Sequence, residues 1–139
     1  TLISFGAVYD ALGEKQKALE YYNTALPLYR AVGDRGGEAT TLNNIGTAYN
    51  ALGEKLKALE YYNTALPLYR AAGDKSGEAN TLVSFGTAYS ALGEKPKALE
   101  YYNTALPLYR AVGDRGGEAT ALVSFGAVYD ALGEKQKAL

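Results

Sequence analysis

The sequence contains no cysteine, histidine, methionine or tryptophan. Without Cys and His, the chain has no disulfide, no thiolate nucleophile, no Ser–His pair and no common soft-metal ligand set. We therefore expect no metal and no cofactor. The acids and bases that remain are carboxylates and lysines, and their spacing places no pair of them in an apolar cleft, so we expect that the chain is not an enzyme.

An excess of charge of one sign is also missing, because 14 basic residues stand against 15 acidic ones. Lys15 and Arg35 alternate with Glu14 and Glu38, whereas nucleic-acid and membrane-surface binding need clustered Lys and Arg. We expect no nucleic acid and no membrane as partner. The Gly-Asp-Lys-Ser string at 73–76 lacks the glycine spacing and preceding strand of a phosphate loop, so we do not expect nucleotide binding.

Long apolar runs are absent, and the N-terminus shows no signal peptide. We therefore expect a cytoplasmic protein. The sequence begins at Thr1 rather than Met and stops inside a repeat, which suggests a fragment of a longer array.

What the sequence does contain is a 40-residue repeat. Residues 1–40, 41–80 and 81–120 align without gaps, and residues 121–139 restart the unit. The first and third units are identical at 35 of 40 positions. Because a fixed period in this range indicates stacked supersecondary units, we predict a single array over residues 1–139, with three full units and one partial unit.

Each repeat contains two stripes of apolar residues at helical spacing. In the second unit the first stripe runs from Leu42 to Leu52 and is followed by Gly53, and the second ends before Gly73. Glycine is the usual residue just after a helix. We therefore predict helices over 35–51 and 55–72, joined in every unit by a tight turn at Leu-Gly-Glu-Lys.

Two further positions recur in every full unit. The aspartates that follow the interhelical glycine are predicted to cap the next helix, where a carboxylate meets free amides and the positive end of the helix dipole. The prolines inside the second helix are predicted to kink it without ending it, because the apolar spacing continues beyond them. These residues are Asp34, Asp74 and Asp114, and Pro27, Pro67 and Pro107.

One set of positions in the second unit carries a family resemblance. The set is Leu42, Ile45, Gly46, Tyr49, Ala58, Tyr62 and Ala65, and it recurs in the first and third units. In type and spacing it resembles the tetratricopeptide repeat. The unit departs from the family pattern in having 40 residues instead of about 34, and in carrying Arg30, Arg70 and Arg110 in place of the usual proline. Such long units are similar to those of kinesin light chains, cell-polarity scaffolds and cyanobacterial signalling arrays.

The resemblance implies an all-α fold, an α-solenoid of stacked antiparallel helix pairs wound into a right-handed superhelix. It also implies a scaffold that binds a peptide or protein segment along its concave face. The residues agree with this independently, because a glycine in the middle of a helix, such as Gly46, costs about 1 kcal/mol relative to alanine. That cost is tolerable if close helix packing needs the missing side chain, and each unit then buries its apolar face only against its neighbours.

By the same resemblance, the first helix of each unit supplies the ligand contacts at fixed positions. In the two middle units these are Thr40, Asn43, Asn44, Thr47, Asn50, Asn80, Ser84, Thr87 and Ser90. No Lys or Arg occupies these positions, so the carboxylate clamp of the chaperone-binding members is missing. Asn44 stands where some arrays present an amide that donates to and accepts from a peptide backbone. The alternative interpretation is that Asn43 and Asn44 are merely solvated polar residues.

A second hypothesis is structural self-assembly. Residues 121–139 nearly duplicate residues 1–19, and the partial unit lacks most of its second helix. A helix at 121–131 would then expose an apolar stripe containing Leu122, Phe125, Val128 and Tyr129. Such a stripe predicts a homo-oligomer formed through the ends of the array by head-to-tail stacking.

Overall fold

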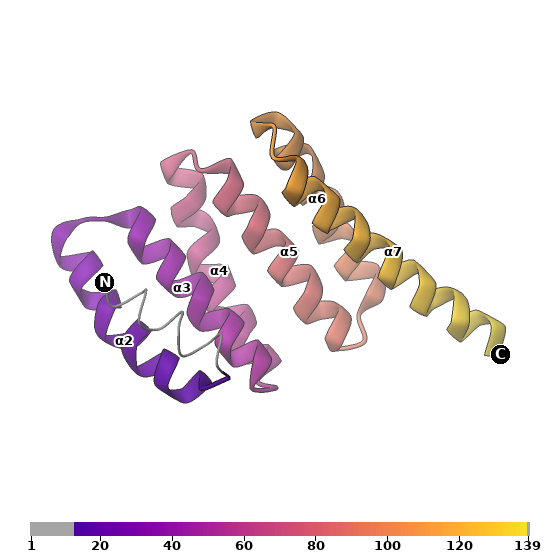
Figure 1. Ribbon diagram of the computed structural model, residues 1–139, viewed down its shortest axis with the longest axis horizontal. Helices are drawn as coiled ribbons and strands as arrows, with labels where there is room; N and C mark the ends of the chain where they lie inside the picture. The colour runs from indigo at the N-terminus through magenta and orange to yellow at the C-terminus, as the bar shows by residue number, and fades with distance from the viewer. Residues whose placement is uncertain (1–12, 139) are drawn as a thin grey trace. The chain divides into compact units, whose positions relative to one another are not determined.

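The computed structural model describes residues 13–138, which form six α-helices and contain no β-strand. The helices are α2 (Lys15–Val32), α3 (Arg35–Ala51), α4 (Lys55–Ala72), α5 (Lys75–Ala91), α6 (Lys95–Val112) and α7 (Arg115–Ala138) (Figure 1). The predicted bounds 35–51 and 55–72 are confirmed. The first helix expected in the first repeat falls on residues 1–12, outside the described residues.

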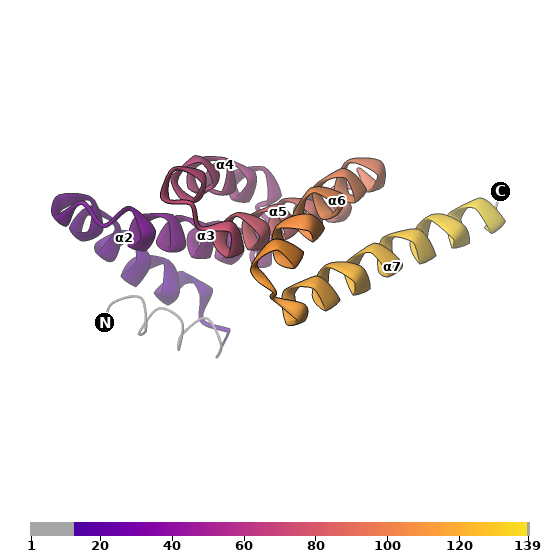
Figure 2. The ribbon, with the colours of Figure 1, turned by 90° about the horizontal axis from the view of Figure 1, so that it is seen from above.

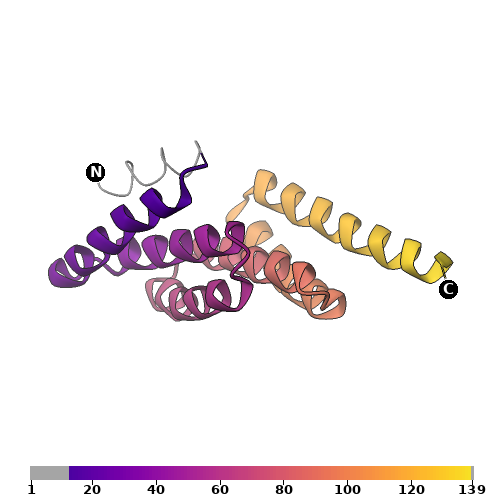
Figure 3. The same ribbon diagram turned by 90° about the horizontal axis from the view of Figure 1, so that it is seen from below.

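Contacts divide the chain into two compact units, Thr1–Asp74 and Lys75–Leu139. In the first unit α3 packs against both α2 and α4 and lies between them (Figure 3). Its core contains Leu19, Tyr22, Leu42 and Ile45. In the second unit α6 packs against both α5 and α7, and Ala98, Tyr102 and Val128 form a buried cluster.

The second helices of the repeats end at glycine, as predicted. Gly33 and Gly113 adopt left-handed conformations with φ of 71° at the ends of α2 and α6. The aspartate after each of these glycines caps the following helix. The Asp34 carboxylate accepts a hydrogen bond from the Gly37 amide at 2.9 Å, and Asp114 accepts from Gly117 at 2.8 Å. These two predicted caps are confirmed.

The glycines in the middle of the first helices are explained by tyrosines of the second helices. A Cβ atom on Gly46 would lie 2.6 Å from Cε1 of Tyr62, and one on Gly86 would crowd Tyr102 in the same way. Real Cβ contacts essentially never come this close. The helix-propensity cost of these glycines is therefore offset by close packing of the two helices in a repeat.

The prolines in the second helices do not end them. Pro27, Pro67 and Pro107 lie inside α2, α4 and α6, each of which continues to the glycine that closes it. The prediction that these helices run through their prolines is confirmed.

The turn predicted in the fourth copy is wrong. The pentapeptide Ala-Leu-Gly-Glu-Lys is identical at 51–55, 91–95 and 131–135. Gly53 and Gly93 form turns with φ of 86° and 85°, whereas Gly133 is helical and α7 continues to Ala138 as one uninterrupted helix (Figure 2). After Gly53 and Gly93 a helix packs back on the preceding one. No described helix follows Gly133, so nothing offsets the hydrogen bonds that a turn would remove.

Candidate functional site

The predicted contact residues lie on two first helices. Thr40, Asn43, Asn44, Thr47 and Asn50 are on α3, and Asn80, Ser84, Thr87 and Ser90 are on α5. All nine are exposed or half-buried, while the residues between them, such as Leu42 and Ile45, form the core. The α3 set lies in the first compact unit and the α5 set in the second.

On α3, two of the predicted hydroxyls already have partners inside the repeat. Thr40 Oγ1 lies 3.0 Å from the Tyr69 hydroxyl, and Thr47 Oγ1 lies 3.2 Å from the Tyr62 hydroxyl. Thr47 also donates to the carbonyl oxygen of Asn43 at 3.1 Å. These hydroxyls join the two helices of a repeat, and Thr47, whose proton is already donated to Asn43, can only accept from a ligand.

The side chains of Asn44 and Asn50 on α3 have fewer hydrogen-bond partners. The side chain of Asn44 is half-buried and makes no hydrogen bond to the described residues. The Oδ1 atom of Asn50 is buried and has no partner within that part of the chain. Lys55 donates instead to the backbone oxygen of Asn50 at 2.7 Å. A buried acceptor without a donor is costly, so Asn50 can accept a hydrogen bond that the described repeat does not supply.

In the second unit, the structure brings two of the predicted residues, Thr87 and Ser90, to one hollow. The hollow has a volume of about 410 Å³ and lies among α5, α6 and α7. Thr87 and Ser90 face it from α5, and Ser124 and Ala127 face it from α7. Ala91, Lys95, Tyr102 and Val128 complete the lining. The lining combines small apolar groups with hydroxyls, which suits an uncharged side chain flanked by peptide groups.

Lys95 was missed by the sequence prediction, which expected no cation in this groove. Its Nζ atom donates to the Ser90 backbone oxygen at 3.0 Å and to Ser90 Oγ at 2.8 Å. The side chain is half-buried and lines the hollow. A signal was present in the sequence, since Lys15, Lys55 and Lys95 each stand five residues after a polar groove position. The lining of this hollow therefore includes a positive charge.

Asn80 is held by a tyrosine of the second helix. The Tyr109 hydroxyl donates to Asn80 Oδ1 at 2.6 Å, and Ser84 donates to the Asn80 backbone oxygen at 3.1 Å. Burial raises the pKa of Tyr109 to about 12, and the nearby Asp114 carboxylate adds to this shift. Tyr109 is therefore a hydrogen-bond donor at neutral pH, and its bond to Asn80 joins α6 to α5, whereas the bond of Ser84 lies within α5.

The residues predicted for self-association divide into two groups on α7. Leu122 is 48% exposed and Tyr129 is 59% exposed, although the equivalent Leu82 on α5 is only 2% exposed. Phe125 is half-buried against the core cluster. Val128 is only 3% exposed because it packs against Ala98 and Tyr102, so it does not belong to the exposed face. Val123, which is 73% exposed, does belong to it.

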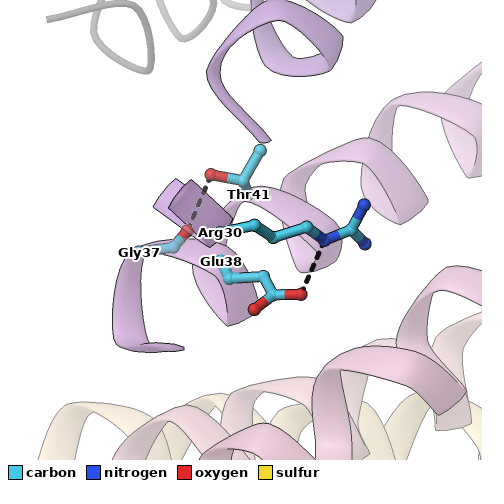
Figure 4. Close-up of polar contacts among 4 residues, drawn as sticks. All are labelled: Arg30, Gly37, Glu38 and Thr41. Atoms are coloured by element: carbon cyan, nitrogen blue, oxygen red, sulfur yellow. Dashed lines mark hydrogen bonds and ion pairs between the residues drawn. The ribbon is translucent and has the colours of Figure 1, made fainter. Parts of the chain in front are cut away.

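A second hollow, which the sequence did not predict, lies in the first unit. It has a volume of about 320 Å³, a floor of Leu26 and Leu42, and a rim that includes Arg30, Lys57 and Glu60. Arg30 Nε donates to Glu38 Oε2 at 2.8 Å, and the two terminal nitrogens of the guanidinium point away from Glu38 (Figure 4). The rim carries both signs of charge, so it offers no clear preference for an anion or a cation.

Neither a metal centre nor a membrane-spanning helix is found in the described part of the chain. No group of three or more His, Cys, Asp or Glu side chains is placed there to hold a metal ion. None of the described helices is long and apolar enough to cross a bilayer.

Solved structures show the same fold. BtubC from P. vanneervenii has a TM-score of 0.83 at 24% identity, over 99% of this chain and 57% of that chain. A putative kinesin light chain from Podospora anserina with nearly identical repeats has a TM-score of 0.78 at 15% identity, over 99% of this chain and 68% of that chain. The Rap conjugation gene regulator of plasmid pLS20, in complex with the Phr* peptide, has a TM-score of 0.84 at 17% identity. The alignment covers 99% of this chain and 38% of the regulator.

Family models match over nearly the whole sequence. One tetratricopeptide repeat model matches residues 37–111 and again 79–139, and a second matches residues 1–31. No curated protein sequence is significantly similar to the chain. The helix pairs, the glycine–tyrosine contacts between them and the two family models all agree, and the chain belongs to the tetratricopeptide repeat family.

Proposed function

We propose that the chain is an interaction module that binds a peptide or protein segment along the exposed face of its first helices. The single observation that carries this proposal is the hollow among α5, α6 and α7. It gathers Thr87 and Ser90, two hydroxyls at positions that the family resemblance had predicted, beside the hydroxyl of Ser124 on α7. The Rap regulator has a similar fold and is complexed with a peptide, which supports the same kind of ligand here.

The chemistry of the hollow defines the expected ligand. Ala91, Ala127 and Val128 provide apolar contact for one short side chain, and Thr87 and Ser124 can hydrogen-bond to the peptide groups on either side of it. Lys95 adds one cation at the rim, which can donate to a backbone carbonyl. A binding role fits these groups better than a catalytic one, because the lining contains no carboxylate to act as an acid or base partner for Lys95.

The proposal is tested by selecting peptides from a random library displayed on phage and measuring their affinity for two variants. Ala127→Leu fills the hollow from an exposed position, and we expect it to weaken binding by roughly tenfold or more. Ala111→Leu makes the same change at an exposed position on α6 outside the hollow, and should leave the affinity unchanged. A failure to enrich any peptide, or equal effects of the two variants, would contradict the proposal.

Self-association is a second candidate function, favoured by the exposed apolar residues of α7. Leu122, Val123 and Tyr129 are each about half exposed or more, and exposed groups of this kind mark association surfaces. Sedimentation equilibrium of the chain over micromolar to millimolar concentrations tests this function. A single monomeric species throughout would rule it out for this chain.

A further inference from the structure

The hollow in the first unit lies apart from the predicted peptide contacts. Its walls come from the second helices α2 and α4, and α3 packs against both of them. Among the described residues, α3 contributes Leu42 to the lining, and none of the predicted contact residues on α3 takes part. A ligand in this hollow would therefore be additional to a peptide on the first helices.

The floor and part of the wall of this hollow are apolar. Leu26 and Leu42 form the floor and are almost fully buried. The Tyr61 ring forms part of the wall and stacks on the Tyr49 ring, with 5.5 Å between the two centroids. The volume of about 320 Å³ lies near the lower limit of small-molecule sites, about 300 Å³. The hollow therefore suits one apolar side chain with a small polar head group.

Arg30 brings free hydrogen-bond donors to the α2 side of the hollow. Its Nε atom donates to Glu38, while the two terminal nitrogens point away from that carboxylate (Figure 4). The planar N–H groups of a guanidinium suit a carboxylate, which they bind through two parallel hydrogen bonds. Lys57, whose Nζ atom lies 4.6 Å from the centroid of the Tyr49 ring, adds a positive charge on the α4 side. The hollow can therefore hold a carboxylate group.

Glu60 brings the opposite charge to the same hollow. It is exposed on α4, and its carboxylate makes no ion pair with another described residue. Thr64 donates to the backbone oxygen of Glu60 at 3.0 Å and leaves the carboxylate free. A simple anion would be repelled by Glu60, and a simple cation by Arg30 and Lys57. A ligand that carries both signs of charge can be attracted by all three.

We propose that this hollow binds a free α-amino acid with an apolar side chain. The ligand side chain lies on Leu26 and Leu42. Its α-carboxylate accepts hydrogen bonds from the Arg30 guanidinium, and its α-ammonium group pairs with Glu60. Because ion pairs at an exposed rim are weak, we expect a dissociation constant of roughly 1 mM.

The first test titrates the ¹⁵N-labelled chain with four small ligands. L-Leucine should produce saturable shifts of the backbone amide signals of Leu42 and Tyr61. N-acetyl-L-leucine lacks the ammonium group, L-leucinamide lacks the carboxylate, and glycine lacks the side chain, so each should bind more weakly by roughly threefold or more. The absence of a saturable shift with L-leucine at tens of millimolar would overturn the proposal, and so would equal affinities for L-leucine and L-leucinamide.

The second test examines the ammonium contact with a pair of matched variants. Glu60→Gln removes a charge at an exposed position and should weaken L-leucine binding by roughly threefold or more, without weakening N-acetyl-L-leucine. Glu20→Gln makes the same change in the identical segment of α2, at an exposed position outside the hollow, and should bind L-leucine like the wild type. Equal affinities of the two variants for L-leucine would contradict the proposed site. Ala127→Leu, which blocks the proposed peptide site, should also bind L-leucine like the wild type, so the two sites are tested separately.

Discussion

Equivalent glycines in near-identical repeats have different surroundings. Gly86 is buried beside the Tyr102 ring, and Gly126 faces open space at the same position of the next unit. The sequence predicted that mid-helix glycines permit close packing, and this is confirmed on α3 and α5. It could not predict that the glycine on α7 has no neighbour, because that depends on which helices lie beside it.

The two glycines give a direct comparison by substitution. Gly86→Ala should lower the free energy of unfolding by about 1–3 kcal/mol, because the new methyl group overlaps the ring of Tyr102. Gly126→Ala should raise it by about 1 kcal/mol, because it gains helix propensity without a clash. Urea unfolding followed by circular dichroism measures both. Effects of the same sign would show that Gly86 is not a packing residue.

Tyr109 makes stability depend on alkaline pH. Its pKa is raised to about 12 by burial, from an ordinary value of 10.0. The folded state therefore holds the phenol proton to a higher pH than the unfolded state, so its contribution is complete below pH 10 and is lost as the pH rises toward 12. Tyr109→Phe should flatten the fall of the unfolding free energy over this window, and an unchanged slope would refute this origin. At neutral pH the variant should lose about 1 kcal/mol with its hydrogen bond to Asn80.

Family position predicted some residues of the groove and missed others. Thr87 and Ser90 were predicted by family position, and the structure brings them to one hollow beside Ser124 of α7. Lys95 was missed because it lies beyond the turn, and only the folded turn returns it to Ser90. Some groove hydroxyls are hydrogen-bonded to tyrosines, as Thr47 is to Tyr62. These pairs depend on the rotation of one helix against the next, which the neighbouring sequence does not determine.

At the scale of elements, identical Ala-Leu-Gly-Glu-Lys segments adopt two different conformations. The predicted helix ends at 51 and 72 agree with the structure because a glycine, a turn and a packed helix all favour them. The segment at 131–135 has the same residues and forms helix instead. The turn is therefore stabilised by packing of the helix that follows it, and its own sequence is compatible with either conformation.

This difference predicts opposite effects of alanine at the turn glycines. Gly93→Ala forces alanine into a positive φ of 85° and should destabilise the chain by about 1–2 kcal/mol. Gly133→Ala should stabilise α7 by about 1 kcal/mol and raise the helical circular dichroism signal, because this glycine lies inside a helix. Loss of helical signal in Gly133→Ala would instead indicate a turn at 131–135.

At the scale of the whole molecule, the 40-residue period predicted stacked units, and the residues at fixed positions within each unit carried the resemblance that implied the family and the fold. Apolar spacing placed the helices, and the small residues at fixed positions identified their packing. The period could not predict that contacts divide the chain at Asp74 and Lys75 rather than at the repeat boundaries. It also could not predict the two hollows, because their volumes depend on how side chains from three helices fill the space between them.

The central claim is that the exposed face of the first helices binds a peptide. Titration of the ¹⁵N-labelled chain with the tightest library peptide tests it most directly, because backbone amide shifts locate the ligand. The account predicts that the largest shifts cluster at Thr87, Ser90, Ser124 and Ala127, around the hollow among α5, α6 and α7. Shifts that cluster instead at Arg30, Glu60 and Thr64, around the hollow in the first unit, would contradict it.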